Sequence, residues 1–183
     1  MKYLTLLLTA TLLILSACDS KQKLPGNIYQ AEYEKVEGMP YNIMLNKHAE
    51  WERTDSFPEF RTLKLSYPLY EADGILTVVM VDSARLLSTM DRFLYLMETR
   101  SDTSGVDISD HAGKGGVSGW TFTGKGGKEQ IQWMATDSST MYVAGNIHFK
   151  AATDSNIDIT DALANIKADI AFMLENLDAS QAE

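Results

Sequence analysis

The sequence contains few of the residues on which many small folds and sites depend. It has one cysteine, Cys18, and only four prolines and three histidines in 183 residues. A lone cysteine cannot form a disulfide within the chain, and three scattered histidines give no zinc-binding pattern. Basic side chains are also scarce, with 16 Lys and Arg against 25 Asp and Glu. This balance argues against nucleic acid or an anionic lipid surface as the main partner.

The one long apolar run lies near the N-terminus and leads up to the cysteine. A lysine at position 2 precedes a Leu-rich, uncharged segment over residues 3–15, and two small residues follow. The run is shorter than the roughly 20 residues that span a bilayer, which favours a secretory signal peptide over residues 1–17. The tetrapeptide LSAC (15–18) resembles a bacterial lipobox, and this resemblance implies a lipid anchor on Cys18. The alternative is an ordinary secreted protein with a cysteine close to its cleavage point.

Without the signal peptide the chain keeps 15 basic and 25 acidic side chains, a formal charge of −10. Its length suits one domain with a sizeable core, and no later segment is long and apolar enough to span a membrane. Residues 18–38 contain proline and glycine and have no sustained hydrophobic period, which predicts a lipidated tether. The domain is expected over residues 39–183.

Three segments in the first half of this domain have the pattern of strands. Alternation of apolar and polar residues marks YNIMLNK (41–47) and, more regularly, RTLKLSY (61–67). The run ILTVVMV (75–81) is apolar on both faces, which predicts a central strand covered on both sides. The second and third segments are expected to form a hairpin.

Two segments, 82–100 and 158–178, show the period of an amphipathic helix. Asp82 or Ser83 is the expected N-cap of the first, and Asp158 or Thr160 of the second. The apolar positions are Leu86, Leu87, Met90, Phe93, Leu94 and Met97 in the first helix and Ile159, Leu163, Ile166, Ile170, Met173, Leu174 and Leu177 in the second.

The polar, Gly-rich segment 99–119 is expected to form a long mobile loop. Strand patterns follow at 119–124, 129–136 and 140–149, joined by the turn sequences KGG and DSS, and they predict an antiparallel meander. The fold class that follows is α+β, with two main helices packed on an antiparallel sheet.

Two near-motifs lack a required residue. In GWTFTGKGG (119–127), Gly126 stands where a phosphate-binding loop needs Ser or Thr, and the segment has the alternation of a strand. In DSNID (154–158), alternate acidic and amide residues resemble the start of a calcium loop, but Ile159 replaces the required glycine. Neither a nucleotide nor a metal site is expected, no cofactor is implied, and no catalytic constellation assembles.

The histidines, His48, His111 and His148, lie far apart in the sequence. His111 falls within the expected 99–119 loop, which could expose it. A small-ligand or metal-binding lipoprotein using this loop is therefore the alternative function.

Beyond the lipobox, five segments follow one another in a distinctive order. They are MPYNIMLNKHAEWE (39–52), FPEFRTLKLSYPL (57–69), GWTFTGKGGKEQIQW (119–133), ATDSSTMYVAGNIHF (135–149) and DIAFMLENLD (169–178). Together they resemble the gliding-motility lipoprotein GldD family of Bacteroidota. The order of strands and helices is also similar to the Mog1/PsbP-like fold.

The family resemblance implies a non-enzymatic accessory or scaffold component of a gliding motility and type IX secretion apparatus. Such a protein would be held to a membrane through Cys18, face the periplasm and bind other envelope proteins. It implies no catalytic residue. The inner and the outer membrane are both open as the site of the anchor.

Overall fold

The computed structural model describes seven stretches of the chain: 22–23, 31–55, 60–80, 83–100, 106–124, 130–150 and 157–181. Four expected features lie outside these residues: the signal peptide (1–17), the lipidation site at Cys18, the KGG turn (125–127) and most of the calcium-like run (154–156). Within the described stretches, no helix combines the length and the apolar character needed to cross a membrane.

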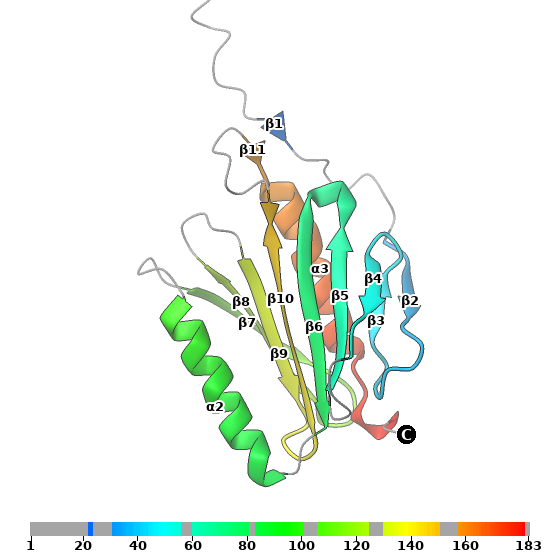
Figure 1. Cartoon of the computed structure of the whole chain (residues 1–183), viewed down its shortest axis with the longest axis vertical. Coiled ribbons are helices and arrows are strands. Elements are labelled where there is room, and N and C mark those ends of the chain that lie inside the picture. Colours follow the sequence, from blue (N-terminus) through cyan, green and yellow to red (C-terminus); the bar gives the residue numbers. More distant parts are fainter. Residues whose placement is uncertain are drawn as a thin grey trace, which may run out of the picture.

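Seven antiparallel strands form the main sheet (Figure 1). They are β4 (Glu50–Arg53), β5 (Phe60–Tyr67), β6 (Ala72–Met80), β7 (Val106–Ala112), β8 (Ser118–Gly124), β9 (Gln130–Thr136) and β10 (Met141–Phe149). Their order across the sheet is β4-β5-β6-β10-β9-β8-β7. The predicted β5–β6 hairpin and the predicted meander of β8, β9 and β10 are therefore confirmed.

The remaining elements are short strands and helices. The strands are β1 (Gln22–Lys23) paired in parallel with β11 (Ile157–Asp158), and β2 (Tyr33–Lys35) paired antiparallel with β3 (Met44–Asn46). The helices are α2 (Ser83–Arg100), α3 (Thr160–Asn176) and the 3-10 turns η1 (Pro68–Tyr70) and η3 (Ala179–Gln181). An α+β fold with an antiparallel sheet and two main helices is confirmed, whereas the likeness to the Mog1/PsbP-like fold stays a prediction.

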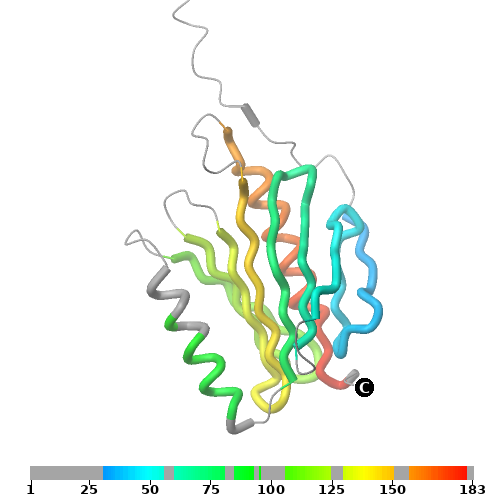
Figure 2. The backbone as a smooth tube through the Cα atoms, viewed as in Figure 1, coloured from blue at the N-terminus to red at the C-terminus, as the bar shows by residue number. Residues whose placement is uncertain are grey.

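The larger core lies between one face of the sheet and α3, and Figure 2 traces how the helix runs along this face. The predicted alternation in β5 is confirmed, because Leu63, Leu65 and Tyr67 all face this core. The apolar stripe of α3 is buried as its 3.6-residue period requires. Its buried apolar members are Ala162, Ile166, Ile170, Met173 and Leu174.

The β2–β3 pair contacts α3 from the side opposite β7, β8 and β9. Residues 33–35, which fall in the range expected as tether, here form β2, and the next residue, Val36, is completely buried. Tyr41, Ile43 and Leu45 are buried in the same core, as their alternation predicts, although the strand itself is shorter than expected. The hairpin therefore closes the side of the core that the main sheet does not reach.

The other face of the sheet is covered only in part. A second cluster joins Leu86 of α2 to buried residues of β6, β8, β9 and β10. The helix is confirmed, but Leu87, expected on its apolar stripe, is 69% exposed. Figure 1 shows α2 set toward β9, and none of the described helices lies in front of β5 and β6. Ile75 of β6 is consequently 46% exposed, so the prediction that this strand is covered on both sides is wrong.

The prediction of a long loop at 99–119 is also wrong, because residues 106–112 form β7, an edge strand paired with β8. Its side chains are mostly exposed, and its sequence, VDISDHA, is correspondingly polar. An edge strand that covers little core lacks the apolar alternation by which buried strands are recognised.

Candidate functional site

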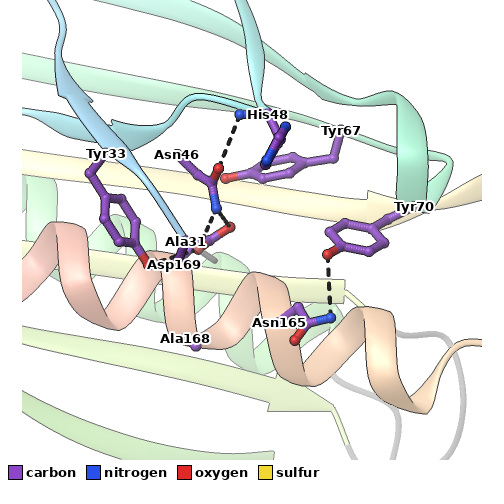
Figure 3. A pocket seen from close by; sticks show the side chains of 9 residues that line it. All are labelled: Ala31, Tyr33, Asn46, His48, Tyr67, Tyr70, Asn165, Ala168 and Asp169. Carbon is purple, nitrogen blue, oxygen red and sulfur yellow. Dashed lines mark hydrogen bonds between the residues drawn. The ribbon is translucent and has the colours of Figure 1, made fainter. Parts of the chain in front are cut away.

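The candidate site is a pocket of about 60 Å³ between the β2–β3 pair, the η1 end of β5 and α3 (Figure 3). Its lining is mainly polar and aromatic. The residues are Ala31, Tyr33, Asn46, His48, Tyr67, Tyr70, Asn165, Ala168 and Asp169. Ala31, His48 and Ala168 are exposed, so the pocket opens to solvent.

Asp169 is the central polar residue of the site. It lies on α3 between the buried Ile166 and Ile170 and is itself only 7% exposed. Its carboxylate accepts hydrogen bonds from the Asn46 amide at 3.0 and 3.1 Å and from the Tyr33 hydroxyl at 2.9 Å. Burial raises the pKa of Asp169 above its usual value, and these donors offset only part of the rise.

Asn46 is oriented by the turn that follows β3. The backbone N–H of His48 donates to Asn46 Oδ1 at 3.0 Å, and the N–H of Ala49 donates to the Asn46 carbonyl at 2.9 Å. With its oxygen engaged in this Asx-type turn, the side chain directs its NH₂ group at Asp169. One asparagine therefore shapes the turn and binds the buried carboxylate.

Tyr33 is positioned by α3. Its ring stacks on Phe172 with the ring centroids 3.7 Å apart and the planes 12° from parallel. Phe172 lies one helical turn after Asp169, so the same helix supplies the aromatic support and the acceptor for the Tyr33 hydroxyl. Burial, and next the nearby Asp169 charge, raise the pKa of Tyr33 above its usual value, so its hydroxyl keeps its proton as a donor.

Tyr67 and Tyr70 form the wall of the pocket at the η1 end. Their ring centroids are 6.5 Å apart, and Asn165 donates from Nδ2 to the Tyr70 hydroxyl at 3.3 Å. Tyr67 is only 3% exposed, and Figure 3 shows its hydroxyl pointing toward Asn46 and Asp169. Within the described stretches, this hydroxyl has no hydrogen-bond partner.

A smaller cavity of about 10 Å³ lies beside the pocket and shares Asn46, Tyr67 and Asp169 with it. The apolar core lines the rest of this cavity, including Trp133 and Met173. The polar cluster therefore sits at the boundary between core and solvent. There, electrostatic interactions are stronger than at a free surface.

The histidines do not come together. His48 lies at the rim of the pocket, and His148 is exposed on β10. His111 is on β7 rather than in a loop, with Nε2 3.1 Å from the Thr121 hydroxyl and Nδ1 3.7 Å from Glu175. In the part of the chain that the structure describes, no three His, Cys, Asp or Glu residues are grouped to hold a metal ion.

Sequence reasoning missed most of this site. The available signal was Asp169, an acidic residue that falls on the apolar stripe of the closing helix, three residues after Ile166 and four before Met173. A carboxylate at such a position is seldom buried unless it has partners. Its partners, Tyr33 and Asn46, come from a range expected as tether and from the polar face of a predicted strand, and neither position is marked as a partner of Asp169.

Comparison with known proteins gives one clear result. The family model described as gliding motility lipoprotein GldD matches residues 20–178, which is most of the chain. The matched range includes all the described residues that line the pocket. No curated protein matches the chain.

Proposed function

Because the chain belongs to the gliding motility lipoprotein GldD family, we propose that it is a non-enzymatic accessory or scaffold component of a gliding and type IX secretion apparatus. The family match over residues 20–178 is the observation that carries this proposal. In the proposed arrangement the folded domain faces the periplasm and binds other envelope proteins.

The anchor in this proposal is Cys18. The cysteine follows an apolar run and two small residues, which is the order that a lipoprotein signal requires. Several acyl chains on one residue hold a protein to a membrane stably, whereas a single chain binds only marginally. A lipidated Cys18 therefore needs no membrane-spanning segment to retain the domain.

The uncovered part of the sheet supports the proposed scaffold role. One cross-strand row runs over five strands on the face away from α3 and defines what we term the open face. Its members are Glu52, Lys64, Ile75, Asn146 and Gln132. The row combines an exposed apolar side chain with charged and amide groups, a mixture found in protein interfaces that form and dissociate.

Crosslinking in native membranes, followed by purification of the tagged full chain, tests this function. We expect gliding or secretion subunits to be captured with the wild-type chain and lost with Cys18→Ala. The variant Ile75→Arg should remain in the membrane and lose the same subunits if the open face binds them. Leu87→Arg is the matched control, because it places the same charge on an exposed leucine of α2.

Capture of the same subunits by Cys18→Ala would contradict the anchored scaffold. Equal losses with Ile75→Arg and Leu87→Arg would contradict the open face as the interface. Enrichment of no envelope protein would refute the proposed function.

The alternative, a ligand-binding lipoprotein, gains no support from His111, whose imidazole contacts Thr121 and Glu175. The Asp169 pocket is the observation that favours a ligand-binding role.

A further inference from the structure

We propose that the Asp169 pocket binds a primary ammonium group, carried either by a free small amine or by the ethanolamine headgroup of a phospholipid. This inference is independent of the proposed scaffold role, because it depends only on the groups that line the pocket. It specifies the ligand by charge, size and hydrogen-bonding capacity.

The charge of the ligand follows from the lining. Asp169 is a buried acidic group, and among the described residues that line the pocket none is Lys or Arg. A buried carboxylate without a cationic partner is costly, whereas one beside a cation is stabilised. Of the described lining residues only His48 could carry a positive charge, and it is exposed at the rim. The interior of the pocket therefore lacks a positive charge that a ligand can supply.

The hydrogen-bonding groups match an ammonium. An ammonium has three N–H donors and no acceptor, so it needs several oxygen atoms around it. Asp169 supplies carboxylate oxygens, and Figure 3 shows the hydroxyl of Tyr67 directed toward Asp169, so its oxygen is a further acceptor at the site. A phenolic oxygen and a carboxylate can both accept hydrogen bonds from one ammonium group.

The tyrosine rings and the volume of the pocket restrict the class of ligand further. The faces of tyrosine rings attract cations, and Tyr67 and Tyr70 both line the pocket. A space of about 60 Å³ is far below that of sites for drug-sized ligands. It suits an ammonium with one or two attached carbon atoms, and it excludes sugars and nucleotides.

The first test is an NMR titration of the purified full chain in detergent micelles with ethylammonium chloride, at fixed neutral pH in sodium chloride buffer. We expect saturable shifts of the Asn46 and Asn165 side-chain amides. The expected Kd is on the order of 1 mM, because a ligand of three non-hydrogen atoms cannot bind much more tightly. Ethanol and potassium chloride are the uncharged and the metal-ion controls.

Two variants locate the binding. Asp169→Asn should weaken the binding of ethylammonium about tenfold or more, because it removes the charge from a charge-assisted hydrogen bond. Tyr67→Phe keeps the ring and should weaken binding several-fold, on the order of threefold to tenfold. Asp161→Asn, which removes an exposed carboxylate from the first turn of the same helix, should leave the affinity unchanged. Circular dichroism confirms that each variant is folded.

A second arm identifies the source of the ammonium group. The lipidated chain is placed in nanodiscs of phosphatidylethanolamine or of phosphatidylcholine, whose trimethylated headgroup has no N–H donor. Shifts of the same amides in phosphatidylethanolamine alone would assign the lipid headgroup. Ethylammonium binding without this difference would assign a free amine.

The proposal is overturned if ethylammonium causes no saturable shift, or if potassium chloride or ethanol causes the same shift. Ethylammonium binding that is equally strong in folded Asp169→Asn would also overturn it. Because these readouts do not involve partner capture, a failure here is distinct from a failure of the scaffold proposal.

Discussion

Tyr33 and Asp169 lie 136 positions apart in the sequence and are joined by a hydrogen bond of 2.9 Å. The bond connects β2, near the start of the folded region, to the middle of α3, which lies near the end of that region. Phe172 stacks on the same tyrosine, so the ring and the hydroxyl of Tyr33 both contact one helix. The N-terminal hairpin and the C-terminal helix therefore depend on each other for their placement.

Removing this hydroxyl should weaken that connection. We expect Tyr33→Phe to lower the free energy of unfolding by about 1–2 kcal/mol, because Asp169 loses one of its donors while the stacking is kept. Urea unfolding of the purified chain measures this change. In an Asp169→Asn background the same substitution should cost less, and an equal cost in both backgrounds would show that the hydrogen bond is not the cause.

Asp169 should make the stability of the fold depend on pH. Its folded-state pKa is raised above the ordinary value of 3.8, so the folded chain holds this proton more tightly than the unfolded chain. Stability should therefore fall as pH rises above the ordinary value and through the folded-state pKa. Urea unfolding over this range should show a loss in the wild type that Asp169→Asn lacks.

The matched control for this titration is Asp161→Asn, which also removes one acidic side chain from α3. Parallel pH profiles for the wild type and Asp169→Asn would refute the assignment of the raised pKa to Asp169.

Asp137, in the turn between β9 and β10, should affect the pH dependence of stability in the opposite direction to Asp169. Burial by itself would raise the pKa of Asp137, but hydrogen bonds from the backbone N–H groups of Met141, Ser139 and Thr140 outweigh burial and hold the pKa well below its usual range. The N···O distances are 2.8, 2.9 and 2.9 Å. We expect Asp137→Ala to lower the free energy of unfolding by about 1–2 kcal/mol at neutral pH.

The stability difference between the wild type and Asp137→Ala should be fully present above pH 3.8, the ordinary pKa of the carboxyl group. It should be lost as pH falls through the lowered folded-state pKa. Chemical denaturation at neutral and acidic pH measures it. A cost for Asp137→Ala that grows toward acidic pH would contradict the lowered pKa.

Gly145 in β10 is required by close packing. It is the cross-strand neighbour of Trp133, whose indole occupies the position where a β-carbon of residue 145 would lie. We expect Gly145→Ala to lower the free energy of unfolding by about 3 kcal/mol, because Trp133 is fully buried and has little freedom to move.

Gly119 provides a matched control for this substitution. A β-carbon there would meet its nearest atoms at 3.5 Å, an ordinary van der Waals contact. Gly119→Ala should therefore be neutral or stabilise the strand by up to about 1 kcal/mol. Thermal unfolding compares the two variants, and similar costs for both would rule out the contact with the indole as the cause.

The fold could be predicted wherever one face of an element is buried. Leu63 and Leu65 in β5, and the stripe through Ile166 and Met173 in α3, carry the period of their element because the core contacts every member. The edge strands β4 and β7 were not predicted, because their exposed side chains need not be apolar. Leu87 shows the reverse limitation, since an apolar residue at helical spacing can still face solvent.

The candidate site was harder to predict because its residues come together only in the tertiary structure. Tyr33, Asn46, Tyr67 and Asp169 belong to four different elements, and no two of them form a sequence motif. Only Asp169 conflicts with its local pattern, as a carboxylate on an apolar stripe. A conflict of this kind indicates a specific interaction without showing which distant residues take part.

The parallel pairing of β1 with β11 limits how far the domain can stand from the bilayer. Gln22 pairs with Ile157 and Lys23 with Asp158, next to the start of α3. Cys18 precedes Gln22 by four positions, and four residues of extended chain reach about 14 Å at most. If Cys18 carries the anchor, the end of the molecule that bears β11 and η1 is the end held near the membrane (Figure 1). The opposite end, with the turn between β9 and β10, then points into the aqueous compartment.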